Sequence, residues 1–408
     1  MLHNLERNEY IMKSIFTLEI FENRLYVKGE IPYISGDKVP QIMLGKNAKV
    51  KSMSINGNGQ YKESIYLNND YFKIYSIDSS KENGTILIEY DSIVEGENNI
   101  LSEDVIALSL YSNTFPTQLP EYIDESICYF KHGFENYDII NSYRDIDSGL
   151  WAKNTIKFAG EIVNIVGYRK GDLKSFEVGN IKVYYRTERS YNNLYECAKI
   201  GVEAFSYYNK IYPCKEAKIE LIELGLGNPS AYCRGDLIVI GAAPEEFHLS
   251  EQFPKDFPLT EEETREWLKY SIFAHELGHR WFCGADMISY EDWLNETGAE
   301  WSSLIFLLQK GEKELFYKFY TFHEYQHKLA GEPIKPKDSH KPNSVHSTGV
   351  VLFYKIYEKY GIDSVLQLLQ ILSKMENPST DKFLDNISKQ LSSEIADFIR
   401  NRLYMSSF

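Results

Sequence analysis

Residues 267–282 read WLKYSIFAHELGHRWF, and within this stretch His275 and His279 stand four residues apart. The apolar residues recur at helical spacing, and the acidic run at 261–263 precedes them, as is typical of a helix start. Residues four apart on a helix lie on one face, so both imidazoles can reach a single ion. The stretch therefore predicts a buried helix that presents a zinc-binding pair of histidines.

Glu296 supplies a third candidate ligand. It lies in DWLNETGAEW at 292–301, which continues as a second apolar helical pattern. Zinc in hydrolytic sites is bound by histidine and carboxylate ligands together with a water. The predicted metal ligands are therefore His275, His279 and Glu296, with one Zn²⁺ per chain. Glu276 would accept a proton from the attacking water and pass it to the leaving amine, so the predicted chemistry is peptide-bond hydrolysis.

The histidine pattern occurs a second time, as HEYQH at 323–327. Aromatic residues upstream predict an amphipathic helix, but the copy runs into KLAGEP at 328–333, a helix stop that no helical carboxylate follows. The bare pentapeptide is a weak signal, and its surroundings favour the first copy. We interpret His323 and His327 as two histidines on a partly exposed helix.

Glu300 competes with Glu296 for the role of third ligand, since it lies one turn further along the same helical face. A solvated or supporting carboxylate is the favoured interpretation of Glu300. Metzincin sites instead need a glycine and a third histidine soon after the pentapeptide, and this chain has Phe282 and Ala285 at those positions. A carboxylate third ligand therefore fits better than a histidine.

The stretch HELGHRWF at 275–282, followed by WLNE at 293–296, resembles the aminopeptidase N and leukotriene hydrolase family of zinc peptidases, which are gluzincins. The resemblance extends to IKVYY at 181–185 and to GVVLFY at 349–354, and it covers most of the chain. The spacing over residues 280–295 is shorter than the family usually has. The resemblance implies a thermolysin-like catalytic domain and a peptide or protein substrate.

The chain is expected to be α+β with two domains. Short β-rich runs such as TLEI at 17–20 and TILIEY at 85–90, separated by turns such as NGNG at 56–59, predict an N-terminal antiparallel β-sandwich or saddle over residues 1–180. Residues 181–408 alternate a strand region with long helices, as a thermolysin-like, mainly helical domain should. The larger family members carry a helical C-terminal cap domain, which we do not expect here.

The family's amine-binding motif is altered in this chain. Where the family has a Gly-x-Met-Glu-Asn stretch whose glutamate binds the substrate's free amine, this sequence reads SAYCR at 230–234. Tyr232 and Arg234 are therefore the candidate substrate-binding residues. An arginine would repel an ammonium group and favour a carboxylate. The enzyme is expected to resemble the aminopeptidases in its zinc site. The altered motif indicates an endopeptidase or a peptidase of unusual end-specificity.

The family's oxyanion-binding tyrosine is also replaced. Alignment on Gly349 places His346 at its position. An imidazole can donate a hydrogen bond to the negative charge that develops on the substrate carbonyl. We therefore expect His346 to act in catalysis beside Glu276. The alternative is that His346 is a loop residue and that Tyr354 or Tyr232 takes this role.

The composition argues against several other functions. The net charge of −15 disfavours nucleic acid and anionic membrane surfaces, and no basic stripe reverses it. The five cysteines form no close pair, which suits reduced thiols. The sequence shows neither a cationic leader nor an apolar window of ~18 residues. It therefore predicts neither export nor a transmembrane segment. A cytoplasmic protein is the default expectation, and the sequence leaves its oligomeric state open.

Two functions of other classes remain. One is a catalytically retired zinc-binding scaffold, although a decayed site need not keep Glu276 beside its ligands. The other is hydrolysis of a non-peptide bond, since the leukotriene branch of the family opens epoxides with this kind of zinc site. The sequence favours an active peptidase over both.

Overall fold

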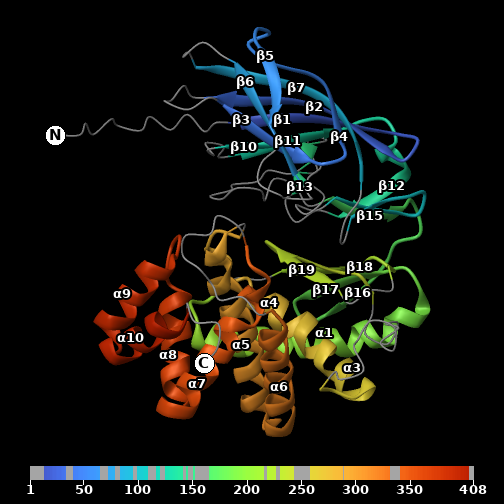
Figure 1. The fold of residues 1–408 in the computed structure, drawn as a ribbon. Helices are drawn as coiled ribbons and strands as arrows, with labels where there is room; N and C mark the ends of the chain where they lie inside the picture. Colours follow the sequence, from blue (N-terminus) through green and yellow to red (C-terminus); the bar gives the residue numbers. More distant parts are fainter. Residues whose placement is uncertain are drawn as a thin grey trace, which may run out of the picture. The chain divides into compact units, whose positions relative to one another are not determined.

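The chain folds into two compact units, Met1–Leu173 and Lys174–Phe408, in a computed structural model (Figure 1). Each unit is described by itself. The structure describes residues 13–33, 40–64, 72–78, 83–94, 99–108, 116–119, 125–140, 144–145, 150–151, 165–215, 218–226, 230–242, 258–287, 289–330 and 341–403. Among these residues, no helix is both long and apolar enough to span a membrane.

The first unit is a β region whose described strands form three sheets. The largest sheet has the order β13-β14-β11-β1-β2-β7-β4, and the two smaller ones have the orders β10-β3-β6-β5 and β12-β15-β9-β8. The strands are β1 (Lys13–Phe21), β2 (Arg24–Tyr33), β3 (Gln41–Gly45), β4 (Ala48–Ile55), β5 (Gln60–Ser64), β6 (Phe72–Asp78), β7 (Gly84–Ile93), β8 (Ile100–Leu101), β9 (Val105–Leu108), β10 (Thr117–Leu119), β11 (Glu125–Phe130), β12 (Tyr137–Ile140), β13 (Arg144–Asp145), β14 (Leu150–Trp151) and β15 (Ile165–Arg169), with a 3₁₀ turn η2 (Phe134–Asn136).

Alternating apolar residues explain which side chains are buried at the centre of the largest sheet. Along β2, Leu25, Val27 and Ile31 are fully buried, because successive side chains of a strand point to opposite faces. The turn between β1 and β2 places Glu22 and Asn23 at positive φ, which is the conformation that a tight hairpin requires. The local pattern and the turn together fix the register of this hairpin.

The largest sheet is mixed, which corrects the antiparallel domain expected from the sequence. β1 runs parallel to β11, with Lys13 opposite Glu125, whereas β2, β7 and β4 follow in antiparallel order. A parallel pair needs a long connection, and the strands between β1 and β11 provide it. Periodicity predicts strands in a sequence, but it does not give the direction in which distant strands pair.

The second unit begins with a five-stranded sheet of order β16-β17-β18-β20-β19. Its strands are β16 (Lys174–Val178), β17 (Ile181–Tyr185), β18 (Ile219–Glu223), β19 (Ala231–Arg234) and β20 (Leu237–Ile240). The central pairs are parallel and the edge pairs antiparallel, and helix α1 (Glu188–Ile211) connects β17 to β18. Because β16 pairs with β17, the predicted boundary at residue 180 falls inside the second unit.

A helical region follows the sheet and makes up most of the second unit (Figure 1). Its elements are α3 (Glu261–Tyr270), the π-helical turn η4 (Ser271–His275), α4 (Glu276–Gly278), η5 (Tyr290–Asp292), α5 (Trp293–Lys310), α6 (Lys313–Ala330), η6 (Asn343–His346), α7 (Thr348–Tyr360), α8 (Ile362–Leu372), α9 (Thr380–Gln390) and α10 (Ser393–Leu403).

Helix α5 lies at the centre of this region, is buried along most of its length and packs against α6, α7 and α8. Trp293 and Trp301 are fully buried, and their ring N–H groups donate to Thr380 Oγ1 (2.9 Å) and to the backbone oxygen of Val350 (3.0 Å). A buried aromatic ring whose N–H group is satisfied stabilises a core. The two tryptophans therefore fix the position of α5 and of the carboxylates that it carries.

The short helix α4 approaches α5 closely at Gly278. A Cβ atom added to Gly278 would lie 2.8 Å from Ala299 Cα and 3.0 Å from the Ala299 backbone oxygen. Both are backbone atoms, which cannot turn away as a side chain can. Glycine therefore lets α4, which the two histidines flank, pack directly against the helix that carries Glu296.

We predict that Gly278→Ala destabilises the second unit by about 1–3 kcal/mol, the usual cost of overpacking a core. Thermal or denaturant unfolding measures the loss. Gly201→Ala in α1 is the matched control, because a Cβ there would meet Ile181 Cδ1 at 2.7 Å, the mobile end of a flexible side chain. Equal losses in the two variants would show that the α4–α5 approach is not especially tight.

Candidate metal centre

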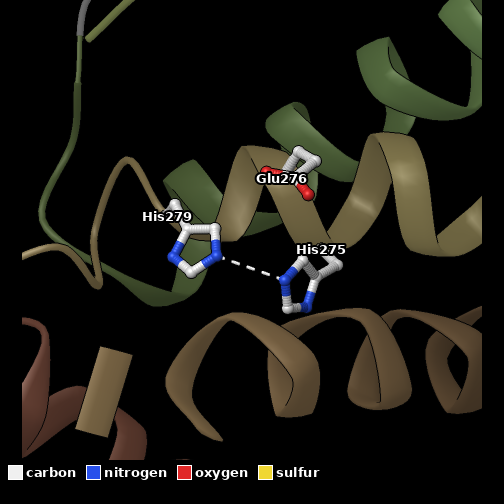
Figure 2. Close-up of side chains that lie close together, drawn as sticks. All are labelled: His275, Glu276 and His279. Atoms are coloured by element: carbon white, nitrogen blue, oxygen red, sulfur yellow. Dashed lines mark hydrogen bonds between the residues drawn. The ribbon is translucent and has the colours of Figure 1, made fainter. Parts of the chain in front are cut away.

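His275 and His279 turn their rings toward one another (Figure 2). Their Nε2 atoms lie 3.1 Å apart, and the rings stand at 89° to each other. The π-helical turn η4 ends at His275, and α4 begins at the next residue. Such a π segment inside a helical run is frequent at functional sites. The two rings thus approach each other from the two ends of α4, since His275 precedes this short helix and His279 follows it.

Glu296, in the first turn of α5, faces this pair. Its Oε2 atom lies 3.6 Å from His275 Nε2 and 3.8 Å from His279 Nε2. Atoms that bind one zinc ion tetrahedrally at about 2.0–2.2 Å stand about 3.3–3.6 Å from one another. The three donor atoms therefore have the spacing and the chemical types of a zinc ligand set, and the residues present fit this metal.

Glu276 lies beside the histidine pair, as Figure 2 shows. A carboxylate oxygen of Glu276 and one ring nitrogen from each of His275 and His279 all lie within 4.8 Å of one another. The side chain is buried, with 6% of the residue exposed. A carboxylate at this distance can contact a water bound between the histidines, so its position suits a general base.

The outer nitrogens of the two histidines face hydrogen-bond acceptors. His279 Nδ1 lies 3.0 Å from the backbone oxygen of Phe282, and His275 Nδ1 lies 2.7 Å from Glu300 Oε2. Both partners are acceptors, so they favour the tautomer that has its hydrogen on Nδ1 and its lone pair on Nε2. Glu300 thus occupies a position that suits a supporting carboxylate better than a ligand.

The second histidine copy lies on the partly exposed helix α6, and its two histidines differ in burial. His323 is 3% exposed, and its Nε2 atom lies 2.7 Å from Glu300 Oε1. His327 is partly buried, and its Nδ1 atom lies 3.1 Å from Thr348 Oγ1. Helix α6 packs against α5 and α7, which turns position 323 into the core. Phe316 and His323 stand seven residues apart and therefore lie on the same face of a helix. This spacing is the sequence signal that would have indicated the burial of His323.

His346, predicted to act in catalysis, lies at the end of η6 with its Nδ1 atom 3.0 Å from Glu296 Oε2. Its side chain is 53% exposed. The same carboxylate oxygen therefore faces the histidine pair and His346. Tyr354, the alternative oxyanion donor, stacks on Tyr320 with ring centroids 3.4 Å apart.

Tyr232 and Arg234, the predicted substrate-binding residues, both lie on β19. Tyr232 is buried and pairs with Val239, while Arg234 pairs through its backbone with Leu237. Strand β19 contacts α4, the helix of Glu276. The structure therefore places Tyr232 and Arg234 on an edge strand next to the helix that carries Glu276.

Burial and charge oppose each other at these groups. Burial disfavours the charged His275 imidazole, but the contact with Glu300 outweighs it and raises the pKa of His275 to about 9. Burial alone would raise the pKa of Glu296, yet His346 and His279 hold it well below its usual range. Burial also disfavours the charged Glu300, whose pKa is nevertheless lowered by His323 and His275. The carboxylates are therefore ionised, as metal ligands and their supports must be.

No protein-family model matches the chain, and no curated protein matches it in sequence. Among solved structures it is similar to native yeast LTA4 hydrolase, with a TM-score of 0.69 and 12% identity over 98% of this chain and 68% of that one. It is also similar to an M1 zinc metallopeptidase from Deinococcus radiodurans, with a TM-score of 0.59 and 13% identity over 98% of this chain and 94% of that one. The likeness confirms, at the level of the fold, the resemblance to the aminopeptidase N and leukotriene hydrolase structures.

We predict that zinc affinity rises with pH up to about pH 9. In the metal-free chain the pKa of His275 is raised to about 9, and zinc binds only the neutral imidazole, so below this pH binding displaces a proton. This one group makes the affinity rise about tenfold per pH unit between about pH 7 and 9. Competition with a chelator whose own pH dependence is known measures it. An affinity that is flat across this range would contradict the raised pKa.

Proposed function

We propose that this chain is a zinc-dependent metallopeptidase that hydrolyses peptide bonds. The observation that carries the proposal is the convergence of His275 Nε2, His279 Nε2 and Glu296 Oε2 at ligand spacing, with the buried Glu276 beside them. The similar solved structures support it, since they include zinc metallopeptidases, one of them in complex with a Tyr-Ser-Ala substrate. Three ligands of this type leave a fourth position open, as catalytic zinc sites do.

The zinc ion, when bound, supplies a Lewis acid that polarises the substrate carbonyl and lowers the pKa of a water. The chain's own residues do the rest. Glu276 takes the proton of the attacking water on its carboxylate and delivers it to the amine that leaves. His275 and His279 keep their lone pairs turned inward because their Nδ1 atoms face acceptors. Glu276 is the only one of these residues that must change its protonation state in each turnover.

We assign His346 to the oxyanion. Its Nδ1 atom faces Glu296 Oε2 at 3.0 Å, so Nδ1 carries a hydrogen and Nε2 donates to a substrate in the imidazolium form, in which both ring nitrogens carry hydrogen. A hydrogen bond to the charge that develops on the carbonyl oxygen stabilises the transition state more than the bound substrate. Because more than half of the His346 side chain is exposed, a substrate can reach it.

The altered motif on β19 sets the specificity in this proposal. The stretch lacks the family's carboxylate and ends in the cation Arg234, so an ammonium group at a free N-terminus is disfavoured and a carboxylate group is favoured. Tyr232 lies two residues earlier on the same strand and is the second candidate substrate contact. We therefore propose an endopeptidase, or a peptidase of unusual end-specificity.

Hydrolysis of a non-peptide bond is the second candidate function. The observation that favours it is the likeness to native yeast LTA4 hydrolase, with a TM-score of 0.69. The same metal centre and the same base would serve both reactions, because each activates a water against an electrophilic carbon. Incubation with a peptide substrate decides between the two functions, because only a peptidase forms cleavage products from it.

We predict that Glu276→Gln keeps one zinc per chain and lowers kcat at least about 100-fold, because the ligands remain while the base is lost. Zinc is measured by elemental analysis, and turnover with a mixed peptide library whose N-termini are either free or acetylated. Cleavage of acetylated peptides by the unsubstituted chain is expected.

Three results would contradict parts of this proposal. Full activity of Glu276→Gln would exclude the assigned base. Stepwise trimming of free N-termini alone would exclude the altered specificity. Bound zinc without cleavage of any peptide would favour a scaffold, or a non-peptide substrate.

We predict that His346→Phe lowers kcat by about 10²–10³-fold with little change in KM, as the loss of an oxyanion donor does. Steady-state kinetics on one good peptide substrate measure both values. Tyr354→Phe is the matched control, since it removes only the hydroxyl of the alternative donor. A loss in Tyr354→Phe and none in His346→Phe would reverse the assignment.

A further inference from the structure

A buried carboxylate lies between the candidate metal centre and helix α6. Glu300 is 4% exposed and His323 is 3% exposed. A charged group removed from water in this way needs partners that replace its hydration. Glu300 comes from α5 and His323 from α6, so the partners of this carboxylate join two helices.

The two oxygens of Glu300 contact different histidines. Oε2 lies 2.7 Å from His275 Nδ1, and Oε1 lies 2.7 Å from His323 Nε2. A third group, Ser303 Oγ, lies at the longer distance of 3.5 Å from Oε1. The chain thus contains a continuous series of contacts that runs from His323 through Glu300 to His275.

The contact with His323 restricts how the carboxylate can turn. The terminal torsion of a glutamate is soft, so one hydrogen bond alone does not fix the plane of the carboxylate. With His323 holding Oε1, Oε2 stays toward His275 Nδ1. An ionised carboxylate only accepts hydrogen bonds, so the hydrogen of a neutral His275 ring stays on Nδ1 and the lone pair stays on Nε2.

We propose that His323, the first histidine of the second pentapeptide copy, is a positioning residue of the metal centre that acts through Glu300 on the orientation of His275. The inference rests on the proposed zinc centre and adds a residue to it. His323 does not touch the ligand atoms, and its effect reaches the metal only through the carboxylate.

The other interpretation of this contact is purely structural. His323 would then satisfy a buried carboxylate and stabilise the packing of α5 on α6, without any effect on the metal. The two interpretations differ in one property. A positioning role changes zinc affinity in a chain that is still folded, whereas a structural role changes only the free energy of unfolding.

The experiment measures Zn²⁺ affinity by chelator competition, and the visible spectrum of the Co²⁺-loaded chain, in four variants whose folding is checked by circular dichroism. His323→Leu is expected to weaken zinc binding about 10–100-fold, as the loss of a partner behind a ligand does, and to alter the Co²⁺ spectrum. His323→Gln can still donate to Glu300 and is expected to restore most of the affinity.

His327→Leu is the matched control, because it removes the other histidine of the same copy, whose ring contacts Thr348 Oγ1 and not Glu300. Its zinc affinity is expected to match that of the unsubstituted chain. The fourth variant, Glu300→Leu with His323→Leu, leaves no unpaired charge in the core. It keeps the test available if His323→Leu does not fold, and it is expected to bind zinc as weakly.

Unchanged zinc affinity and an unchanged Co²⁺ spectrum in folded His323→Leu, or in the folded double variant, would overturn the inference. So would an equal loss in His327→Leu. The unsubstituted chain and His279→Ala report separately on the zinc centre itself. If the unsubstituted chain binds no zinc, the proposed function fails and this inference with it, whereas a failure confined to the His323 variants leaves the zinc centre in place.

Discussion

The close approach of α4 to α5 is the constraint on which the candidate centre depends. Gly278 stands against the backbone of Ala299, and this contact sets how far the histidine pair lies from the first turn of α5. A zinc site tolerates only small errors in the positions of its donor atoms. Two helices in direct backbone contact provide that precision, because a close-packed core resists displacement. The tryptophans of α5 hold the same helix from its other sides.

The centre also depends on the partners of its charged groups. Glu300 is buried and Glu296 is partly buried, and each is surrounded by histidine nitrogens at 2.7 to 3.8 Å. In a protein interior a lone carboxylate would take up a proton, since burial disfavours its charge. The histidines keep both carboxylates ionised. One carboxylate can therefore face a cation from within the core while the other orients the ring that binds it.

The sequence predicts the local parts of this centre well and the distant parts poorly. His275 and His279 follow from helical spacing, and Glu296 follows from the first turn of the next helix. The parallel pairing of β1 with β11 and the burial of His323 depend on which helices and strands meet, and no short window of sequence contains that information. The contact between His346 and Glu296 is also a product of tertiary packing, since η6 and α5 are separated by the whole of α6.

The two pentapeptide copies show why the pattern alone does not define a metal site. Both copies place two histidines four residues apart, the second on helix α6 and the first on either side of the short helix α4. In the first, both Nδ1 atoms face acceptors, so both Nε2 atoms point into one space, where they lie 3.1 Å apart. In the second, His323 uses Nε2 on Glu300 and His327 uses Nδ1 on Thr348, so the two rings contact different partners. The hydrogen-bond partners of the imidazole rings therefore decide which pair of histidines can bind a metal.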